Sequence, residues 1–420
     1  MEYGFPLGLQ EDFLLKPVMK NHSSSYEFYS YVDKFIKNEL EKGGMTGPFS
    51  TSPFSNIMIS PLMTSPKKPD SRRTVFDASF SDFSLNLNTP EKLYLDEQFE
   101  FTFPKLDDFG QLIIQYGHGC YLWKRDLSRF FLQLPLDPLD YDKLGCIWRG
   151  QLLLFTAYVW GTRHAGMNGQ RVTNCVSAIH RSLGSENYCS HKSDGCKSNC
   201  PHSLTDSITL SPFNTLNYSD DFAGVEGNLN RANISFSVMG SLLTELGLTE
   251  STDKAVSPCQ RLTYLGIEFD TCSMEMRINE SKCTELQSDL KTWTRKTVAT
   301  KTELQTILVK LLWVSRAVKF SRCFVLRIIA EVKKLKFQSQ EITLSNDVKK
   351  DFLWWQLFMS HFNGVHLLIV SETPEQISGD ACPMGYGSWN PNTCEFLHVA
   401  MDLLRLLEIC LLVSFYKACR

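Results

Sequence analysis

The sequence of 420 residues is 43% hydrophobic and 21% charged, proportions of an ordinary globular protein with room for about two to four domains. Its net charge of −3 excludes nucleic-acid binding driven by overall charge, so any such function must depend on local clusters of basic residues. The 14 cysteines lack the spacing of a small disulfide framework and no signal peptide opens the chain, which favours an intracellular protein of the cytoplasm or nucleus.

The first half of the chain mixes helical and strand patterns. Residues 1–25 read as a leader that we expect to be disordered, and helical spacing then runs up to Glu41 before a Gly-Gly stop. A Pro/Ser-rich extended stretch with short strands follows. Further on, β-branched and aromatic residues on both sides predict a hairpin that turns at Arg149-Gly150. A helix is predicted after it, ending at Gly184.

The composition changes at 184–210, a polar and aperiodic stretch rich in Ser, Cys and His that interrupts the regular pattern. Five potential zinc ligands occur within it: Cys189, His191, Cys196, Cys200 and His202. Their spacing fits no common structural zinc module. A flexible surface loop is the favoured interpretation, with a zinc site and an imperfect gene prediction or sequence decay as alternatives. Zinc analysis of the purified protein distinguishes them.

Regular pattern resumes after this insert and continues to the end without an internal repeat. The predicted elements are, in order, a hairpin at 216–226, a helix at 230–248, strands at 261–271 and 275–278, about three amphipathic helices at 280–336, a helix at 345–362, and a final strand, strand and helix. This order predicts an α+β protein of three or four subdomains.

Two adjacent aspartates, Asp220 and Asp221, lie at the turn of the hairpin "LNYSDDFAGVE". Their charges repel, and such a string by itself is more often a solvated turn. A third acid, Asp126, follows a short apolar strand, where a lone Asp is more often a turn cap. Three carboxylates converging from two strands would be strongly repulsive unless they held cations, and two Mg²⁺ ions about 4 Å apart suit in-line phosphoryl transfer.

These strings, in this order, resemble the reverse transcriptases of retroelements, closest in pattern to Gypsy-like and DIRS-like retrotransposons. "KRDLSRFFLQLPLDP" resembles the first catalytic motif of that family, "VWGTRHAGMNGQRVTNCV" its template-positioning motif, and "NYSDDFAGVE" its Tyr-x-Asp-Asp hairpin. "DKAVSPCQRLTYLGIEFDT" resembles the next two motifs, and "ISPLMTSPKKPDSRRTVFD" resembles the fingers segment. The order and spacing match from Val32 to Asn363.

The resemblance implies an RNA-directed DNA polymerase, a nucleotidyltransferase that adds dNTPs to a primer 3′-hydroxyl. Its cofactor would be two Mg²⁺ ions, for which Mn²⁺ can substitute, and its partners a primed RNA or DNA template and dNTPs. The metals would be bound by Asp126, Asp220 and Asp221, and Lys254 would protonate the departing pyrophosphate. Oligomeric state stays open, because some relatives act as monomers and others as dimers.

Further residues are carried over by their place in the motifs. Lys68 and Arg73 would grip the triphosphate, and Phe131 would pack against the sugar and exclude a 2′-hydroxyl. The remaining candidates are Tyr218 at the nucleotide, and Leu265 and Gly266 as the primer grip.

The template-positioning motif departs from the usual pattern. Where the family has Pro-Phe-Gly, this chain has Val159-Trp160-Gly161, and Gly166 stands where Pro is usual. We interpret this as divergence rather than loss of function, which leaves Gly161 and Gln170 to shape the nucleotide pocket.

The segment from Ser281 to Lys336 carries 13 Lys and Arg residues against four Asp and Glu. Taken alone, it reads as a solvated helical face; after a polymerase palm, it reads as a thumb that grips duplex phosphates. The resemblance thus divides the chain into fingers and palm (26–279), a helical basic thumb (280–337), a connection (338–373) and a ribonuclease H-like segment (374–420).

The tail "SGDACPMGYGSW" resembles the first strands of a ribonuclease H domain, with Asp380 as its first metal ligand and Glu408 as its helix glutamate. Because further required aspartates are missing, we expect no nuclease activity and vestigial roles for both residues. The apolar run 403–416 contains Arg405 and Glu408 and is too short to span a bilayer, so no membrane association is expected.

The predicted fold is therefore an α+β polymerase right hand, with fingers, a palm built on an antiparallel sheet and a helical thumb, followed by an incomplete ribonuclease H-like α/β unit. The main alternative to an active polymerase is a catalytically inactive retroelement remnant or a host-adopted nucleic-acid-binding protein. An RNA-templated RNA polymerase shares the palm chemistry, but Phe131 and the nuclease-like tail argue against it.

Overall fold

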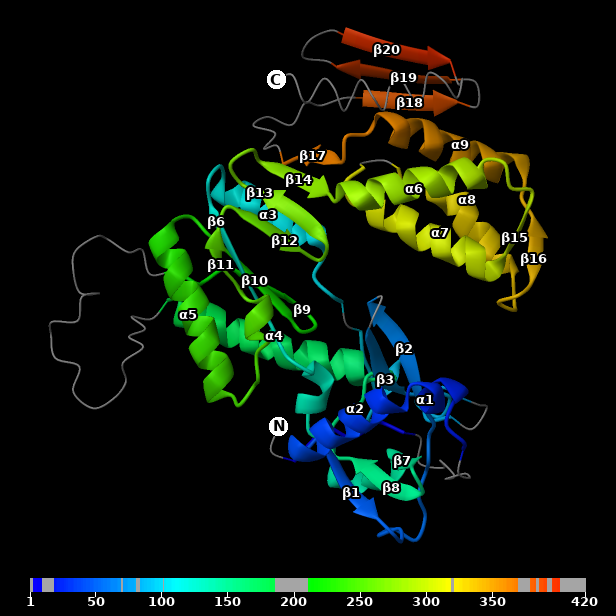
Figure 1. Cartoon of the computed structure of the whole chain (residues 1–420). Coiled ribbons are helices and arrows are strands. Elements are labelled where there is room, and N and C mark those ends of the chain that lie inside the picture. The colour runs from blue at the N-terminus through cyan, green and yellow to red at the C-terminus, as the bar shows by residue number, and fades with distance from the viewer. Residues whose placement is uncertain are drawn as a thin grey trace, which may run out of the picture. The chain divides into compact units, whose positions relative to one another are not determined.

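The structure is a computed structural model, and it divides into two compact units that both mix helices with strands (Figure 1). The first unit comprises Met1–Pro104, Trp123–Gly224 and Asn233–Ser257; the second comprises Lys105–Leu122, Val225–Ala232 and Pro258–Arg420. The residues described are 3–9, 19–68, 71–80, 84–100, 102–185, 211–318, 321–368, 378–382, 385–390 and 395–400. The predicted α+β class is confirmed; the finer subdomain boundaries stay predictions.

Short strands and longer helices alternate through the first half of the chain. In chain order they are α1 (Ser23–Glu27), α2 (Tyr29–Glu41), β1 (Met45–Phe49), β2 (Leu62–Lys68), β3 (Ser71–Phe76), β4 (Leu93–Tyr94), β5 (Glu97–Gln98), β6 (Tyr121–Asp126), β7 (Gly145–Trp148), β8 (Gln151–Phe155), α4 (Ala165–Leu183), β9 (Thr215–Tyr218), β10 (Asp221–Glu226), α5 (Leu229–Glu245) and β11 (Val256–Cys259). They build a sheet of order β1-β8-β7, a sheet of order β11-β6-β10-β9, and the hairpins β2-β3 and β4-β5.

Turn chemistry explains the first of these sheets. Strands β7 and β8 pair from Gly145↔Leu154 to Trp148↔Gln151, which leaves Arg149 and Gly150 as a two-residue turn. Both turn residues have positive φ, 51° and 77°, as a tight hairpin of the type I′ class requires. The hairpin predicted at this position is confirmed, as is the end of helix α2 at Glu41.

The prediction that residues 1–25 form a disordered leader is wrong for residues 3–9, which pack within the first unit, and for residues 23–25, which begin helix α1. The backbone N–H of Phe5 donates to the Pro135 carbonyl at 2.9 Å, and the Asp137 N–H donates to the Phe5 carbonyl at 3.0 Å. Leu7 is only 3% exposed. Residues 3–9 have no periodic pattern of apolar residues, because this segment is held by its backbone rather than by an amphipathic face.

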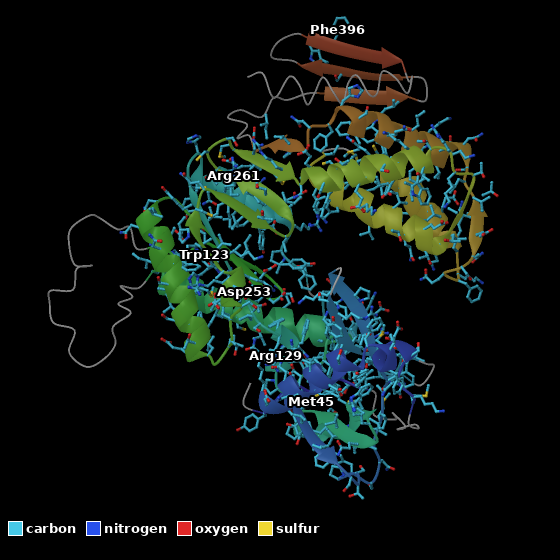
Figure 2. All side chains as sticks on the ribbon, viewed as in Figure 1. Met45, Trp123, Arg129, Asp253, Arg261 and Phe396 are labelled. Carbon is cyan, nitrogen blue, oxygen red and sulfur yellow. The ribbon has the colours of Figure 1, made fainter. Side chains whose placement is uncertain are left out.

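The core of the first unit gathers beneath the sheet that contains β6. Trp123, labelled in Figure 2, is fully buried, and its indole N–H donates to Ser235 Oγ at 3.1 Å. Its six-membered ring fills the space beside Gly224, where a Cβ would come within 2.2 Å of the indole. Strand β10 therefore needs glycine at this point to lie close to Trp123.

A buried histidine beside this core makes folding depend on pH. Neutral His180 donates from Nε2 to the Ser235 carbonyl at 2.9 Å and accepts from Thr215 Oγ1 at Nδ1, 2.8 Å away. Burial lowers its pKa from 6.5 to about 4. The unfolded chain therefore binds a proton between these pH values that the folded chain does not, so stability present above pH 6.5 is lost as pH falls towards 4.

We expect the free energy of unfolding to fall by about 3 kcal/mol over this interval through His180 alone. The change to examine is His180→Gln, because a glutamine amide can both donate to Ser235 and accept from Thr215 without titrating. Denaturant unfolding at half-unit pH steps should show a shallower pH dependence for this variant. Identical slopes in variant and parent would refute the prediction.

The second unit begins with α3 (Leu106–Tyr116) and a sheet of order β12-β13-β14-β17. Its strands are β12 (Arg261–Tyr264), β13 (Ile267–Asp270), β14 (Glu275–Ile278) and β17 (Val365–Leu367). The strand predicted at 261–271 is wrong as a single element, because the chain reverses at Leu265-Gly266, where φ is 49° and 81°. Phe109 of α3 covers this sheet, with its ring 4.8 Å from that of Tyr264 and 5.1 Å from that of Phe269.

Four helices form a bundle in the rest of this unit (Figure 1). They are α6 (Glu280–Trp293), α7 (Lys301–Val314), α8 (Cys323–Lys334) and α9 (Asn346–His361), with β15 (Val298–Thr300) paired to β16 (Glu341–Thr343). The predicted helices of this region are confirmed. Thr300 and Glu303 form a capping box at α7, and Ser345 caps α9 by accepting from the Val348 N–H.

The tail has three antiparallel strands: β18 (Ser378–Cys382), β19 (Gly385–Asn390) and β20 (Glu395–Ala400). Two strands and a helix were predicted; the third strand is a correction, and the helix with Glu408 lies outside the described residues. Across the described part of the chain, no helix has the length and apolar character needed to cross a membrane.

Candidate active site

Three aspartates meet where strand β6 ends beside the β9–β10 hairpin. Asp126 is the last residue of β6, and Asp221 is the first residue of β10. The register Asp221↔Tyr218 leaves Ser219 and Asp220 as the turn, with φ of 54° at Ser219. The Leu127 N–H donates to the Asp220 carbonyl at 3.0 Å, which fixes the turn against the end of β6. The convergence predicted from two strands is thus present.

Burial and mutual repulsion raise the pKa values of two aspartates in this cluster. Asp126 is only 4% exposed. Burial, and then the negative charge of Asp126, raises the pKa of Asp220. Burial also raises the pKa of Asp221 to about 6; Lys124 opposes this rise, and the neighbouring Asp126 adds a smaller contribution to it. The carboxylates of Asp220 and Asp221 are therefore poorly stabilised in their charged form by the protein around them.

Two lysines supply positive charge to the cluster. Lys254 Nζ lies 2.7 Å from Asp126 Oδ1, and Lys124 Nζ lies 2.9 Å from Asp221 Oδ1. The second contact pairs Lys124 with the buried Oδ1 of Asp221, and the hydrogen bond and charge of Lys124 oppose the rise in the pKa of Asp221. The hydrogen bond to Asp126 raises the pKa of Lys254. The role of Lys124 was not foreseen in the sequence.

The residues fit a hard divalent cation. Carboxylate oxygens are the ligands that Mg²⁺ prefers, and a cation would offset the burial and the repulsion from Asp126 that raise the pKa values of Asp220 and Asp221. Among the residues described, no three His, Cys, Asp or Glu side chains already have the geometry of a metal cage. The aspartates therefore form a charged cluster, neutralised in part by lysines, rather than a preformed cage.

The side chain of Gln133 holds the backbone near Asp126. Gln133 donates from Nε2 to the Thr249 carbonyl at 2.9 Å and accepts from the Thr249 N–H at 2.5 Å. The Ser251 N–H then donates to the Asp126 carbonyl at 2.7 Å. The loop that leads to Lys254 is thereby tied to the segment that follows Asp126.

Gln170, predicted to shape the nucleotide pocket, instead holds the hairpin from helix α4. It is 1% exposed; its Nε2 donates to the Asn217 carbonyl at 3.1 Å, and its Oε1 accepts from the Ser219 N–H at 2.8 Å. Its amide thus fixes the turn that carries Asp220. Gln170 is thus a positioning residue: it holds the turn that carries Asp220.

Phe131 lies in the short 3-10 helix η1 (Phe130–Gln133), five residues beyond Asp126, and is half-buried. Its ring centroid is 5.0 Å from that of Phe130, and both rings abut Gly169, where a Cβ would come within 2.7 Å of Phe130 and 3.1 Å of Phe131. Tyr218 packs its ring 4.7 Å from that of Phe103. A glycine in α4 therefore sets the position of the predicted sugar gate.

The predicted triphosphate residues lie on the β2–β3 hairpin. Lys68 ends β2 and pairs with Ser71, and Arg73 pairs with Ser65. The exposed Arg73 guanidinium lies 4.4 Å from the ring centroid of Trp160, a cation–π contact. The neighbouring Gly161 has φ of 105° and accepts from Asn86 Nδ2 at 2.7 Å. The unusual Trp160 of the divergent motif thus orients a predicted phosphate ligand.

The other predicted residues lie in the second unit or outside the described residues. Leu265 and Gly266 form the β12–β13 turn, and a Cβ on Gly266 would come within 3.7 Å of Trp313. Asp380 lies in β18, opposite Gly387. The insert at 184–210 is described only at 184 and 185, so its five potential zinc ligands are not covered.

Two ion pairs near the aspartates gave no recognisable signal in the sequence. Arg129, with φ of 50°, donates from Nε to Glu39 Oε1 at 2.8 Å, and Glu39 is 1% exposed (Figure 2 labels Arg129). Arg125 Nη1 lies 2.5 Å from Glu250 Oε2, and its guanidinium stacks 3.7 Å from the centroid of Phe236. Both arginines flank Asp126 and fix the chain on either side of it.

Solved structures of foamy viral protease-reverse transcriptase are similar to the whole chain. The dRH form with double-stranded DNA matches at a TM-score of 0.58 and 13% identity over 98% of this chain and 62% of that chain. A second complex with double-stranded DNA matches at 0.58 and 14% over 97% and 75%, and one with an RNA/DNA hybrid at 0.56 and 15% over 99% and 49%.

No family model and no curated protein matches the sequence. At identities of 13 to 15% the structural likeness establishes the fold alone: the chain has a reverse-transcriptase-like fold. The chain spans 62% of the length of the first of these proteins and 49% of the third. The bound DNA and RNA/DNA hybrid are properties of those three structures.

Proposed function

We propose that the chain is an RNA-directed DNA polymerase of a retrotransposon, of Gypsy-like or DIRS-like type, that adds dNTPs to a primer 3′-hydroxyl. The observation that carries the proposal is the convergence of Asp126, Asp220 and Asp221 within a reverse-transcriptase-like fold. Complexes of the structural neighbours with double-stranded DNA and an RNA/DNA hybrid support a primed template as its partner.

Asp126, Asp220 and Asp221 would hold two Mg²⁺ ions, which when bound lower the pKa of an attacking hydroxyl and neutralise a leaving pyrophosphate. Before binding, Lys254 and Lys124 reduce the repulsion among the aspartates. Because Lys254 is 54% exposed, its ammonium can leave Asp126 and donate a proton to a departing phosphate oxygen. The fixed turn at Ser219 keeps Asp220 and Asp221 side by side throughout.

The basic helices support a role in gripping duplex phosphates. Ion pairs with acids neutralise four of their basic residues: Lys296, Lys310, Arg327 and Lys334. Within the described residues, Arg295, Arg316 and Arg322 are exposed and have no acid within 4.0 Å. Such residues bind a backbone regardless of its sequence and lose affinity as salt rises.

The decisive experiment is primer extension on an RNA template with Mg²⁺, comparing the parent chain with Asp126→Asn. Asparagine has nearly the same size as aspartate, but it lacks the negative charge that binds a cation. We expect the parent to extend the primer and Asp126→Asn to fail, and we expect EDTA to abolish extension by the parent. Equal extension by both, or none from either with both folded, would overturn the proposal.

The lysines also favour a second candidate, a nucleic-acid-binding remnant without catalysis. Both Asp126 and Asp221 already have ammonium partners, so the cluster has charge compensation without any metal. A chain that binds a primed duplex with a strong salt dependence, yet extends no primer with either Mg²⁺ or Mn²⁺, would establish this candidate instead.

Phe131→Ala should raise incorporation of ribonucleotides relative to deoxynucleotides, on the order of 10- to 100-fold. Removing the half-buried ring opens space where a 2′-hydroxyl would otherwise meet it. Competition between dNTP and NTP in primer extension measures the ratio. Phe130→Ala is the matched control: because Phe130 is 4% exposed, it should lower stability with little change in sugar selectivity. Unchanged selectivity in Phe131→Ala would remove Phe131 from this role.

A further inference from the structure

A short N-terminal segment, Gly4–Gly8, lies against the rest of the first unit as a bound peptide would. The residues around it, here called the groove, are Tyr94, Leu136, Asp140, Tyr158, His164 and Asn168. Phe5 forms a parallel bridge with Leu136 and exchanges backbone hydrogen bonds with residues on both sides of it, at 2.9 Å to the Pro135 carbonyl and 3.0 Å from the Asp137 N–H. Addition of an extended segment to a strand-like edge is a standard mode of peptide recognition.

Side chains of the groove recognise the backbone of the next two residues. The hydroxyls of Tyr94 and Tyr158 both donate to the Pro6 carbonyl, the first at 3.0 Å. Asn168 Nδ2 donates to both hydroxyls, at 3.1 and 2.9 Å, and so orients their protons towards that carbonyl. These groups are buried, and without Pro6 each hydroxyl would lack an acceptor.

Leu7 is held from both sides of its peptide. Its N–H donates to Asp140 Oδ2 at 2.6 Å, and its carbonyl lies 3.1 Å from His164 Nδ1, while the other ring nitrogen of His164 lies 3.0 Å from the Pro90 carbonyl. Its side chain is 3% exposed, which supplies the apolar contact of the segment. The segment thus has one buried apolar side chain, and four polar side chains contact its peptide groups.

The segment can enter this groove only because it is bounded by glycines. Gly4 has φ of 78°, and a Cβ there would come within 2.4 Å of the Leu136 carbonyl oxygen. Gly8 has φ of 68°, and its Cβ would come within 2.8 Å of the Tyr94 ring. Positive φ and close backbone approach both exclude larger residues.

The groove is connected to the aspartate cluster through helix α4. Asn168, which orients the two tyrosines, lies two residues before Gln170, whose Oε1 accepts from the Ser219 N–H at the Asp220 turn. His164 is the residue that precedes the first turn of the same helix. Occupancy of the groove therefore fixes the end of α4 from which the turn is held.

We propose that this groove is a peptide-binding site whose ligand is the segment Gly4–Gly8 of the same chain, and that its occupancy positions the Asp220 turn through α4. The ligand is recognised as an extended Gly-Phe-Pro-Leu-Gly peptide, by its carbonyls, the N–H groups of Phe5 and Leu7, and the Leu7 side chain. This inference does not depend on polymerase activity, because every contact lies within the metal-free chain.

The test uses the full chain with Gly4→Val and Leu7→Asp, which release the segment, and a fluorescent peptide MEYGFPLGLQED in trans. The peptide should bind the released variant and not the parent, whose groove is already filled. Adding Tyr94→Phe and Tyr158→Phe should weaken this binding at least tenfold, while a peptide carrying Leu7→Asp should not bind. Equal binding to parent and variant, or none to a folded variant, overturns the binding site.

Hydrogen exchange tests the positioning role without any activity assay. The amide of Ser219 should exchange at least tenfold faster in the released variant and recover its protection when the peptide binds. A purely local structural role would leave Ser219 unchanged, which would overturn this part of the proposal. If the released variant does not fold, Tyr158→Phe in the full chain, compared with Tyr3→Phe at an exposed position, should speed exchange of Phe5 and Ser219; unchanged exchange at both amides is the opposing result.

Discussion

Asp220→Asn is expected to abolish primer extension, by about 1,000-fold or more, while raising the thermal stability of the metal-free chain. The two effects have opposite signs for one reason. The pKa of Asp220 is raised by burial and by the charge of Asp126, so the folded chain favours the neutral carboxyl and folding is penalised when it ionises at neutral pH. Asparagine removes that charge and keeps the shape.

The sign can be checked by measuring the melting temperature with EDTA at pH 5 and pH 8. The advantage of Asp220→Asn over the parent should be larger at pH 8, where more of the parent carboxyl is ionised, and should shrink as the pH falls towards the raised pKa. The matched control is Asp253→Asn, at an exposed aspartate beside Lys254, which should change neither activity nor stability. A less stable Asp220→Asn, or one that still extends primers, would contradict the assignment.

Gly224→Ala is expected to destabilise the chain by about 3 kcal/mol or more. The new Cβ would lie 2.2 Å from the indole of Trp123, which is fully buried and hydrogen-bonded to Ser235 Oγ. At this distance the methyl group cannot be accommodated in place, so strand β10 or the indole must shift. Denaturant unfolding measures the loss.

A double-mutant cycle isolates the cause. Trp123→Leu should cost stability alone by opening a cavity, but together with Gly224→Ala it should cost clearly less than the sum, because the smaller side chain admits the methyl group. The control is Gly166→Ala, at a helical position with nothing within 4 Å, which should be neutral or slightly stabilising. Full additivity would show that the steric contact with Trp123 is not responsible.

Local chemistry explains which elements could be predicted from the sequence. The turn at Arg149-Gly150 and the helices between Glu280 and Lys336 follow from glycine placement, periodicity and caps such as Thr300, all of which are read within a few residues. The strand at 261–271 was misread because its alternation continues through Leu265, an apolar residue at φ of 49°. A branched side chain in a tight turn gives no turn signal.

Contacts between distant residues explain the rest of the site. The order of motifs was enough to bring Asp126 to the Asp220 turn, but not to find the partners that hold them. Arg129 and Glu39 are 90 residues apart, and Gln133 and Thr249 are 116 apart, so neither pair can be recognised from spacing. Lys124 was overlooked for a different reason: a lysine in a strand reads as solvent-facing until the strand's neighbours are known.

The way in which Gln133 and Gln170 hold the site has a consequence for divergence. Each glutamine contacts backbone groups, of Thr249 in one case and of Asn217 and Ser219 in the other. Every residue except proline offers the same N–H and carbonyl, so the side chains at the recipient positions can drift without loosening the loop or the turn. The two glutamine side chains therefore keep the geometry of the aspartates when the side chains of the contacted residues change. Contacts of this kind help a fold to persist at sequence identities as low as 13%.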